Sequence, residues 1–264
     1  MVSIIIVAYN NKKVLSRCLD SILANKNKGN IEIIVIDNNS KDGTKYLFEK
    51  DRYNKIKYIV NSENIGFGRA NNQGAAIAKN SYLWFLNSDT YIEDDFLNKF
   101  KLLISNYNNL IVFSPLVYNF RKELESRFYG VFPSLINTFL AKFFPKKKDL
   151  NKNLKFFNVD WVSGASMIVR KEAFISAGGF DRRFFMYFED IDLCWRLKDL
   201  DYKTFIVSDL LVYHQKGASL DKNPKLRKKY YYNSQDVFFK KHYNIIIYIL
   251  MKVMRKIYLL FKKI

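Results

Sequence analysis

Cysteine is scarce in this 264-residue chain, which contains only Cys18 and Cys194. The two lie far apart in the sequence and neither belongs to a CxxC pair, so neither a disulfide framework nor a zinc site is indicated. A reducing, cytoplasmic compartment is therefore expected. The first residues also lack the basic leader and the long apolar stretch of a secretory signal, and we expect residues 2–8 to form a buried strand instead.

Acidic residues are outnumbered, because 25 Asp and Glu stand against 44 Lys and Arg, for a formal net charge of +19. This excess predicts an anionic partner: nucleic acid, acidic lipid or a phosphorylated substrate. It is concentrated in residues 222–264, which hold twelve basic residues and a single acid, Asp236. With 49% hydrophobic and 17% aromatic residues, the chain can bury the core of one large domain or of two fused lobes, and disorder is not expected.

Short apolar runs rich in β-branched residues recur at residues 2–8, 31–36, 56–60 and 81–86, each of a length suited to a strand buried on both faces. Helical patterns separate them. In the first pattern, apolar side chains recur at three- and four-residue spacings from Val14 to Leu23. Strands that alternate with helices predict an α/β fold with a doubly wound, mostly parallel sheet, in which ligands bind beyond the carboxyl ends of the strands.

Four loops follow these strands, at residues 9–11, 37–43, 61–68 and 87–90, and all are rich in Asn, Asp, Ser and Gly. Such residues favour turns for local reasons, which explains any one loop taken alone. Four polar loops at one predicted edge favour a binding site. The last loop contains Asp89, and a carboxylate just past a buried strand is suited to hold a divalent cation that neutralises a leaving diphosphate.

A second acidic run, EDID at residues 189–192, begins a predicted helix after a glycine turn at 178–179 and an aromatic stretch. Acidic residues offset the dipole in a first helical turn, so Glu189 and Asp192 need no catalytic role. The glycine turn and the aromatic residues favour an acceptor pocket. A general base must remove the proton of an acceptor hydroxyl, and a partly desolvated carboxylate is the usual choice, which makes Asp190 our candidate.

In order and spacing, these motifs resemble a family 2 glycosyltransferase of the A-type fold, most similar in pattern to bacterial rhamnosyltransferase-like members. The resemblance covers roughly residues 2–243. It rests on VSIIIVAYN at 2–10, VIDNNSKDGT at 35–44, NIGFG at 64–68, NSDT at 87–90 and FEDIDL at 188–193. The family usually has Asp-x-Asp where this chain has Asn87-Ser88-Asp89, so the metal site has one carboxylate fewer.

The resemblance implies roles for individual residues. Asp190 would act as the base with support from Glu189 and Asp192, and the configuration at the anomeric carbon would be inverted. Mg²⁺ or Mn²⁺ would bind Asp89, with His214 as a further metal ligand or a contact to the diphosphate; a structural histidine is the alternative. The nucleotide sugar would contact Ala8, Tyr9, Asn10, Asp37, Asn38, Asn64, Gly66, Arg69, Asn72, Asn87 and Ser88, and the transferred sugar and the acceptor would lie against Trp161 and Gly164.

We expect the catalytic domain to span residues 1–221, with an insertion at 119–158 on the acceptor side, and a basic helical tail to span 222–264. Within residues 245–264, apolar positions form one stripe, while Lys252, Arg255 and Lys256 recur at near-helical spacing. Charges interrupt every stretch long enough to cross a bilayer. This basic amphipathic helix is therefore expected to lie in the interface of an anionic membrane. The alternative is a helix that packs its apolar side onto the domain.

We therefore expect the protein to be an inverting glycosyltransferase that is peripherally bound to the inner face of the cell membrane. It moves a sugar from dTDP-rhamnose, or another nucleotide sugar such as a UDP-linked hexose, onto a hydroxyl of a lipid-linked precursor of a cell-surface glycan. A nucleic-acid-binding protein is one alternative, but the charge lies in the tail rather than across a sheet face, and no nucleic acid is expected. A non-catalytic nucleotide-sugar-binding protein is the other, because Asn87 weakens the metal site. The linkage and a homo-oligomeric state stay open.

Overall fold

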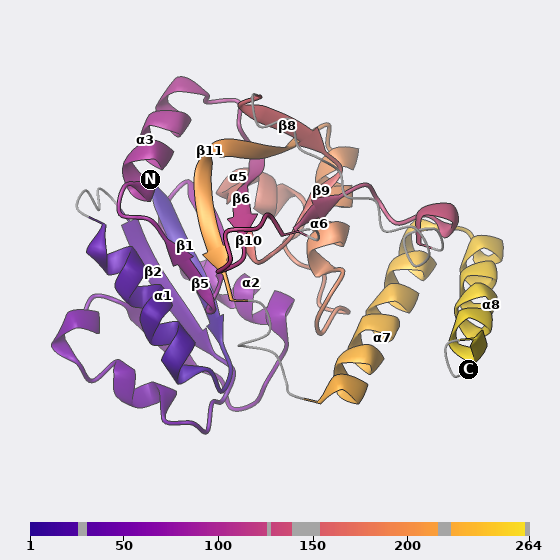
Figure 1. Ribbon diagram of the computed structural model, residues 1–264, viewed down its shortest axis with the longest axis horizontal. Coiled ribbons are helices and arrows are strands. Elements are labelled where there is room, and N and C mark those ends of the chain that lie inside the picture. Colours follow the sequence, from indigo (N-terminus) through magenta and orange to yellow (C-terminus); the bar gives the residue numbers. More distant parts are fainter. Residues whose placement is uncertain (26–30, 126–127, 139–153, 216–222, 262–264) are drawn as a thin grey trace.

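The computed structural model describes residues 1–25, 31–125, 128–138, 154–215 and 223–261. Its centre is a nine-stranded sheet, across which the long strand β11 curves (Figure 1). In spatial order the strands are β3 (Lys57–Val60), β2 (Ile31–Asp37), β1 (Val2–Ala8), β4 (Tyr82–Asn87), β10 (Ser166–Arg170), β6 (Val112–Tyr118), β11 (Thr204–His214) and β5 (Thr90–Ile92). The ninth strand, β8 (Phe156–Val159), pairs with β11, and a separate ribbon consists of β7 (Tyr129–Gly130) and β9 (Trp161–Val162).

The first half of the sheet is parallel and the second half is mixed. Strands β3, β2, β1 and β4 run in one direction, β10 runs against both β4 and β6, and β11 is parallel to β6. The four predicted strand runs correspond to β1, β2, β3 and β4, with ends that differ by at most one residue. Two 3₁₀ turns, Thr44–Leu47 and Asp51–Tyr53, connect β2 to β3. The prediction of an α/β fold is confirmed, with the expected parallel pairing in the first half of the sheet.

Helices cover both faces of this sheet (Figure 1). On one face lie α1 (Lys12–Ala24) and α3 (Phe96–Asn106), and on the other lie α2 (Phe67–Ile77), α5 (Lys171–Ser176) and α6 (Glu189–Asp199). Successive residues of β1 face opposite layers: Ile4 and Ile6 pack in the core that contains α1, while Ile5 packs in the core that contains α2. Burial on both faces explains why β1 is apolar at every position except Ser3, whose hydroxyl donates a hydrogen bond to Glu32.

The predicted insertion at residues 119–158 is described in part, and residues 139–153 lie outside the described ranges. Its first part turns back towards β6 through the bridge between Tyr118 and Leu124, so that the backbone N–H of Glu125 donates to Val117 O. Its last part contains β8, which pairs with β11. Both described ends therefore join the main sheet, and the acceptor-side position of the insertion stays a prediction.

Two C-terminal helices, α7 (Pro224–His242) and α8 (Ile245–Phe261), follow β11. The side chain of Asn223 caps α7 by accepting hydrogen bonds from two backbone N–H groups of its first turn. Phe238 and Phe239 of α7 are fully buried in the core, so this helix belongs to the folded body. The predicted boundary between residues 221 and 222 stays a prediction, because residues 216–222 lie outside the described ranges.

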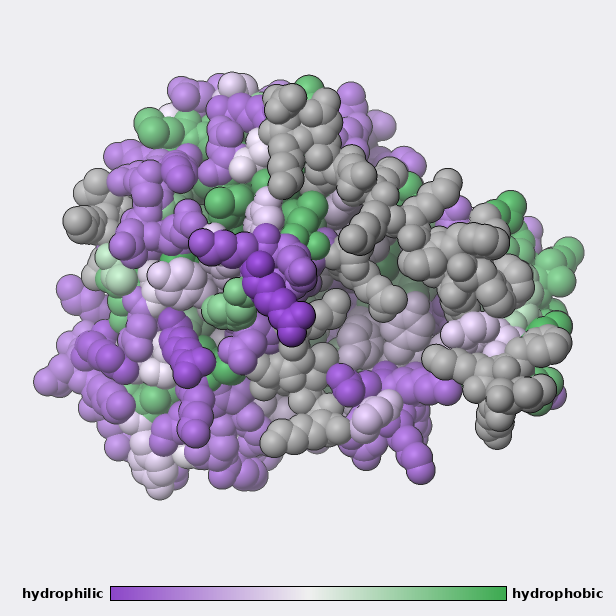
Figure 2. All heavy atoms as spheres, viewed as in Figure 1, coloured by the Kyte–Doolittle hydropathy of each residue, from purple (hydrophilic) through white to green (hydrophobic). Residues whose placement is uncertain are grey.

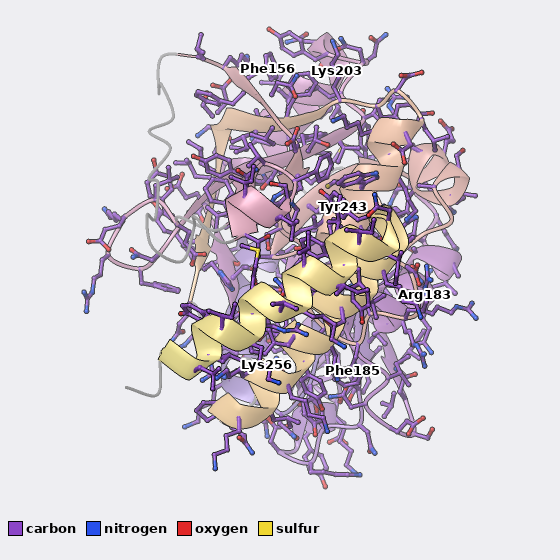
Figure 3. The ribbon with its side chains drawn as sticks, turned by 90° about the vertical axis from the view of Figure 1, so that its right-hand side faces the viewer. Phe156, Arg183, Phe185, Lys203, Tyr243 and Lys256 are labelled. Atoms are coloured by element: carbon purple, nitrogen blue, oxygen red, sulfur yellow. The ribbon has the colours of Figure 1, made fainter. Side chains whose placement is uncertain are left out.

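Helix α8 lies along the outside of the molecule, with Lys256 towards its C-terminal end (Figure 3). It covers most of the predicted 245–264 helix; residues 262–264 lie outside the described ranges. Its apolar stripe is exposed, with between 45% and 62% of each side chain accessible at Ile245, Ile249, Val253, Ile257 and Leu260. Hydrophobic side chains accordingly gather on the α8 end of the molecular surface (Figure 2). The helix therefore does not pack this stripe onto the domain, and no helix of the described residues is long and apolar enough to cross a bilayer.

Candidate active site

The polar loops predicted to form a site lie at one edge of the sheet. In the parallel register Ala8 pairs with Asp37, Asp37 pairs with Val60, and Val7 pairs with Asn87, so the four strands end together. Because the carboxyl ends of parallel strands share an edge, the loops that follow them are neighbours in space. The predicted position of the site is consistent with this arrangement.

Asp37 is buried at the end of β2, and its carboxylate is held within the protein. Its Oδ1 accepts a hydrogen bond from the backbone N–H of Ser40, and its Oδ2 accepts one from the hydroxyl of Tyr58. Burial and the Asp37 carboxylate raise the pKa of Tyr58, so that this hydroxyl keeps its proton and remains a donor. The carboxylate is thus rigidly oriented, and its contact with a nucleotide base stays a prediction.

Other polar side chains of these loops bind one another. Asn38 Nδ2 donates to Asn64 Oδ1 over 3.1 Å and to Gly66 O over 3.2 Å, and Asn11 Nδ2 donates to the Ser88 hydroxyl. These contacts fix the loops without a ligand, as a preorganised binding surface requires. The residues predicted to contact the nucleotide sugar include buried ones, Ala8, Asn38 and Ser88, and exposed ones, Tyr9 and Asn10.

Residues predicted to border the donor also bind the loop that precedes α6. The Asn72 amide forms two hydrogen bonds to the Phe180 backbone, donating to its O over 2.8 Å and accepting from its N over 2.9 Å. Arg69 Nε donates to a backbone carbonyl of the same loop. Gly66 has a φ of +89°, and a Cβ there would lie 2.4 Å from Phe185 O, so a larger residue would displace the loop. These three residues hold the loop against α2, and their contact with a donor stays a prediction.

Asp89 lies in the turn between β4 and β5 and is 3% exposed. Strand β11 runs antiparallel to β5, so His214 pairs with Thr90 and its Nε2 comes within 3.1 Å of Asp89 Oδ1. On the other side of the ring, His214 Nδ1 is 3.2 Å from Glu125 Oε1. The structure therefore brings together the two predicted metal-binding residues and adds Glu125, which the sequence motifs do not indicate.

The surroundings of His214 favour a charged imidazole. Burial disfavours the charge, but the hydrogen bond with Asp89 and the nearby carboxylate of Glu125 outweigh burial and raise the pKa of His214 to about 9. At neutral pH the ring is positively charged beside the turn that contains Asp89. An imidazolium can contact a diphosphate oxygen, whereas ligation of a metal ion requires the loss of a ring proton.

The Asp89 carboxylate is a candidate ligand for a divalent cation. Among the described residues, no group of three or more His, Cys, Asp or Glu side chains is arranged to hold a metal ion. Mg²⁺, however, is commonly bound by one or two carboxylates together with substrate phosphates. The Asp89 carboxylate and the Asn87 amide oxygen would serve as such ligands, with His214 close by, since its Nε2 is 3.4 Å from Asn87 Nδ2. The donor set fits a cation that binds together with a nucleotide diphosphate.

Asp190 lies in the first turn of α6, and each of its oxygens accepts a backbone hydrogen bond. Oδ2 accepts from Gly164 N over 2.9 Å, and Oδ1 accepts from Ile191 N over 2.8 Å. Burial raises the pKa of the Asp190 carboxyl, and these hydrogen bonds oppose the rise. The carboxylate is thus fixed in orientation and more basic than an exposed aspartate, as a general base requires.

Glu189 is buried beside the candidate base, and its Oε2 has no hydrogen-bond partner among the described residues. Burial and the charge of the neighbouring Asp190 raise the pKa of Glu189 well above its usual range. A protonated Glu189 leaves Asp190 as the charged member of this pair. The arrangement suits the predicted division between a base and a supporting acid, which stays a prediction.

The turn at residues 163–165 connects the two acidic motifs. Gly164 donates to Asp190, and the next residue, Ala165, accepts a hydrogen bond from Asn87 N over 3.0 Å through its carbonyl. Gly164 is also tightly packed, because a Cβ there would lie 2.8 Å from the ring of Phe67. Trp161, just before the turn, donates from its indole N–H to a backbone carbonyl. Gly164 therefore lies between the motifs, while sugar or acceptor contacts for it and Trp161 stay predictions.

Asp192 binds α7. Its side chain is fully buried, and its carboxylate pairs with Lys241 Nζ at 2.6 Å, with His242 Nε2 at 2.7 Å and with Arg196 Nη2 at 2.8 Å. Lys241 and His242 lie at the end of α7, so the cluster joins α6 to α7. Three basic partners occupy this carboxylate, which favours a structural role over direct support of Asp190.

The turn into α6 has a left-handed backbone at two bulky residues, Tyr187 with a φ of 70° and Phe188 with a φ of 67°. Such conformations are costly for residues other than glycine and persist where surrounding contacts enforce them. Helix α7 provides these contacts, because the Ser234 hydroxyl donates to Met186 O and Tyr231 packs against both rings. Helix α7 therefore fixes the turn that positions the candidate base.

The sequence motifs predict a polar sheet edge with Asp89 and His214, and an aspartate at the start of a helix. The structure contains both and links them through residues 163–165. The family described as Glycosyl transferase family 2 matches residues 3–177 of the chain. The chain belongs to this family. It is a glycosyltransferase, so the predicted family and enzyme class are confirmed. The family match runs from β1 through α5 and includes Asp89, while Asp190 and His214 lie beyond it.

Two relatives of this glycosyltransferase match most of its length. Rhamnosyltransferase WbbL of Escherichia coli (strain K12) is 32% identical over 211 residues, which cover 75% of this chain and 76% of WbbL. The N-acetylglucosaminyl-diphospho-decaprenol L-rhamnosyltransferase of Mycobacterium tuberculosis (strain ATCC 25618 / H37Rv) is 25% identical over 262 residues, which cover 89% of this chain and 82% of that protein. The predicted similarity to rhamnosyltransferases is confirmed.

The fold of the glycosyltransferase is shared with a solved mannosyltransferase, PcManGT from Pyrobaculum calidifontis, which was determined in complex with GDP-Man and Mn²⁺. The two structures align with a TM-score of 0.57 at 17% sequence identity, over 84% of this chain and 58% of PcManGT. The chain therefore spans less than two thirds of that protein. At this level of identity the likeness shows the common fold.

Proposed function

We propose that this glycosyltransferase transfers rhamnose from dTDP-rhamnose, with inversion, to a hydroxyl of a lipid-linked precursor of a cell-surface glycan. The observation that carries the proposal is the connection of Asp190 to the Asn87–Asp89 turn through residues 163–165. Through this connection, hydrogen bonds join a fixed base to a site suited to a diphosphate. Similarity to two rhamnosyltransferases over most of the chain supports the choice of sugar.

Asp190 is the proposed general base. As the acceptor oxygen attacks the anomeric carbon, its proton passes to a carboxylate oxygen of Asp190. The bond from that carbon to the diphosphate oxygen breaks, and its electron pair leaves with the nucleoside diphosphate. Attack opposite the leaving group inverts the anomeric configuration. The N–H groups of Gly164 and Ile191 orient the carboxylate for this transfer.

His214 and Asp89 are proposed to bind the diphosphate end of the donor. The charged His214 imidazole attracts the phosphate oxygens, and Asp89 and Glu125 hold the ring in place from either side. Mg²⁺ or Mn²⁺ bound at Asp89 would stabilise the negative charge that develops on the leaving diphosphate. Both contributions act on the leaving group, while Asp190 acts on the acceptor.

The donor is tested by measuring nucleoside diphosphate release from a panel of nucleotide sugars. The acceptor is a lipid-diphosphate-linked N-acetylglucosamine, the class named for the mycobacterial relative. We expect dTDP-rhamnose to be used with a kcat/KM at least about tenfold above that of UDP-glucose, since selectivity of this size is typical of pocket contacts to a sugar. Preferential use of a UDP-hexose would overturn the choice of rhamnose but not the glycosyltransferase activity.

Helix α8 is proposed to hold the enzyme on the anionic inner surface of the cell membrane, where a lipid-linked acceptor is accessible. Its exposed stripe is apolar, and Lys252 and Lys256 are exposed beside it. Apolar side chains that enter the lipid interface, with lysines left near anionic headgroups, are typical of helices that lie on a membrane. Another face of α8 packs against the core through Met251, so the helix is held on the domain while its exposed stripe is left for the membrane.

The double variant Ile249→Asp/Ile257→Asp is expected to lower co-flotation with phosphatidylglycerol vesicles by at least about tenfold, because each change removes a large apolar side chain from the lipid contact. Hydrolysis of the donor in solution should be unchanged. The matched control is Leu102→Asp/Ile175→Asp, which places the same charges at apolar residues that are 62% exposed and lie outside α8. Flotation of the α8 variant equal to that of the control would contradict membrane attachment through the stripe.

A further inference from the structure

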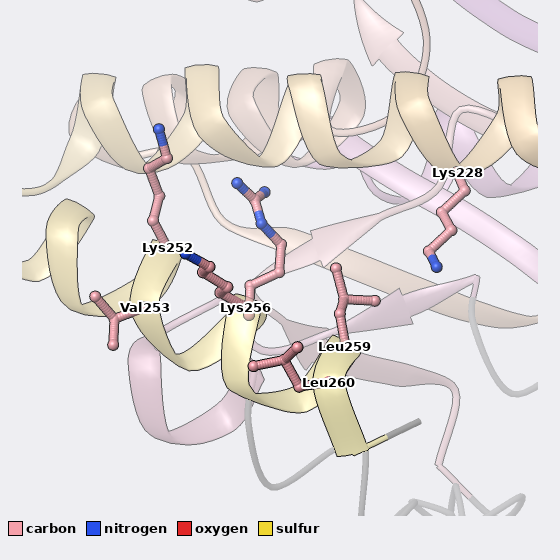
Figure 4. A pocket seen from close by; sticks show the side chains of 7 residues that line it. Lys228, Lys252, Val253, Lys256, Leu259 and Leu260 are labelled. Atoms are coloured by element: carbon pink, nitrogen blue, oxygen red, sulfur yellow. The ribbon is translucent and has the colours of Figure 1, made fainter. Parts of the chain in front are cut away.

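A groove with a volume of about 650 Å³ lies between α7 and α8. Lys228 points from α7 towards α8, and Lys252 points from α8 towards α7 (Figure 4). The remaining lining residues come from the second half of α8 and include two further cations, Arg255 and Lys256. No residue of the sheet edge described above lines this groove. It is a separate feature from the candidate active site.

The cations of the groove differ in how their charge is balanced. The Arg255 guanidinium donates to both carboxylate oxygens of Asp236, at 2.7 Å and 3.0 Å, and Asp236 is the single acid in α7 and α8. Lys228, Lys252 and Lys256, here called the groove lysines, form no ion pair with any residue in the described part of the chain. The groove therefore presents uncompensated positive charge to a ligand.

The other lining residues are apolar, namely Val253, Leu259 and Leu260. Val253 and Leu260 also belong to the exposed stripe of α8, so the groove is continuous with the surface proposed to enter the membrane. A ligand that matches both the lysines and the apolar residues of the groove has a phosphate for the lysines and a hydrocarbon part for the apolar residues. A phospholipid has both, whereas a nucleic acid or free phosphate has only the first.

We propose that this groove binds the headgroup phosphate of one anionic phospholipid. The groove lysines contact the phosphate, and the apolar residues contact the glycerol and the first part of the acyl chains. The lipid fixes α8 at the membrane surface in one orientation, beyond the diffuse attraction that any basic helix has for anionic lipid. This inference rests on the membrane part of the proposed function and is independent of the proposed donor and base.

The test compares flotation of the whole protein with vesicles of phosphatidylcholine alone and of phosphatidylcholine with phosphatidylglycerol. The groove variant is Lys228→Gln/Lys256→Gln. Its matched control, Lys225→Gln/Lys240→Gln, removes the same charge from exposed lysines of α7 that do not line the groove. One lysine near an anionic surface typically contributes about fivefold to partitioning. Loss of two direct contacts to the lipid phosphate should therefore weaken binding to phosphatidylglycerol vesicles by at least about 25-fold relative to wild type. Binding of the control to the same vesicles should weaken by less than about threefold, which is less than the contribution of one lysine at the surface.

Several results would overturn the proposal. Equal losses of vesicle binding in the two variants would mean that overall charge, rather than the groove, determines binding. Release of the wild-type protein from vesicles by inorganic phosphate, but not by chloride of equal ionic strength, would mean that the groove binds free phosphate. Displacement from the vesicles by an oligonucleotide would assign it to nucleic acid. Thermal unfolding of both variants shows whether they are folded. Nucleoside diphosphate release without vesicles, expected to be unchanged in both, separates failure of this proposal from failure of the proposed chemistry.

Discussion

Substitution of Asp190 by asparagine is expected to lower kcat for sugar transfer by about three orders of magnitude, within the range typical for loss of a general base. Asparagine has the same shape, and its amide oxygen can still accept the hydrogen bond that Gly164 donates to Oδ2. It cannot take the proton of the acceptor hydroxyl. Because the base acts on the acceptor, the calorimetric affinity for the nucleotide sugar should change by less than about threefold, so the loss falls on the chemical step.

A matched control for this variant is Asp199→Asn, which makes the same change at an exposed position of the same helix. The control should transfer sugar at the wild-type rate. Nucleoside diphosphate release is followed for all three proteins with a true acceptor, so that hydrolysis without an acceptor is not mistaken for transfer. Equal rates for wild type and Asp190→Asn would refute Asp190 as the base, and the carboxyl of Glu189 would then be the next group to test.

Substitution of Asp192 by asparagine is expected to lower the free energy of unfolding by about 3–5 kcal/mol, as is typical when one partner of a buried ion pair is removed. The change would leave Lys241, His242 and Arg196 around a buried position that has lost its negative charge. Because α7 fixes the turn before α6, kcat should fall as well. The free energy is measured by urea unfolding monitored by circular dichroism.

A surface ion pair provides the control for the stability effect. Asp209 pairs with Lys155 at 2.8 Å, but the two side chains are 50% and 42% exposed, so Asp209→Asn should cost less than about 1 kcal/mol.

The pH dependence of the free energy of unfolding gives a second check on the role of Asp192. Burial opposes ionisation of Asp192, but its basic partners outweigh burial and lower its pKa from the ordinary value of 3.8. Its stabilisation is therefore present above that value and is lost as the pH falls through the lower folded pKa. A difference between wild type and Asp192→Asn that persisted in strong acid would contradict this role.

Much of the fold and of the sheet edge could be predicted because the relevant signals are local. Strand β1 is buried on both faces and so is apolar at every position except Ser3. Helix α1 has one buried face and so shows a three- and four-residue periodicity. Parallel strands end at a common edge, which follows from topology once the strands are known. The start of α6 at Glu189 was predicted from an acidic first turn that precedes apolar residues.

The contacts that hold Glu125 and Lys241 in place were not predicted, because each joins residues far apart in the chain. Glu125 reaches His214 only because the chain turns back on β6, and no motif surrounds it in the sequence. In the sequence, Lys241 is one of many lysines in a basic segment, and no neighbouring residue distinguishes it as a partner of Asp192. The packing of α7 in the core was not predicted either, because the basic composition of this segment suggested a tail.

In the proposed mechanism, Asp89 and a divalent cation act on the diphosphate of a nucleotide sugar while Asp190 activates the acceptor. Its most direct test is the rate of nucleoside diphosphate release from dTDP-rhamnose with acceptor, measured for wild type and Asp89→Asn with Mn²⁺, after chelation and after Mn²⁺ is restored. We predict that chelation lowers the wild-type rate by at least about a hundredfold, the scale of losing one electrostatic contact to a developing charge. Restored Mn²⁺ should recover the rate in wild type but not in Asp89→Asn. Rates that are unaffected by chelation and equal in the two proteins would contradict a role for Asp89 and a cation at the diphosphate.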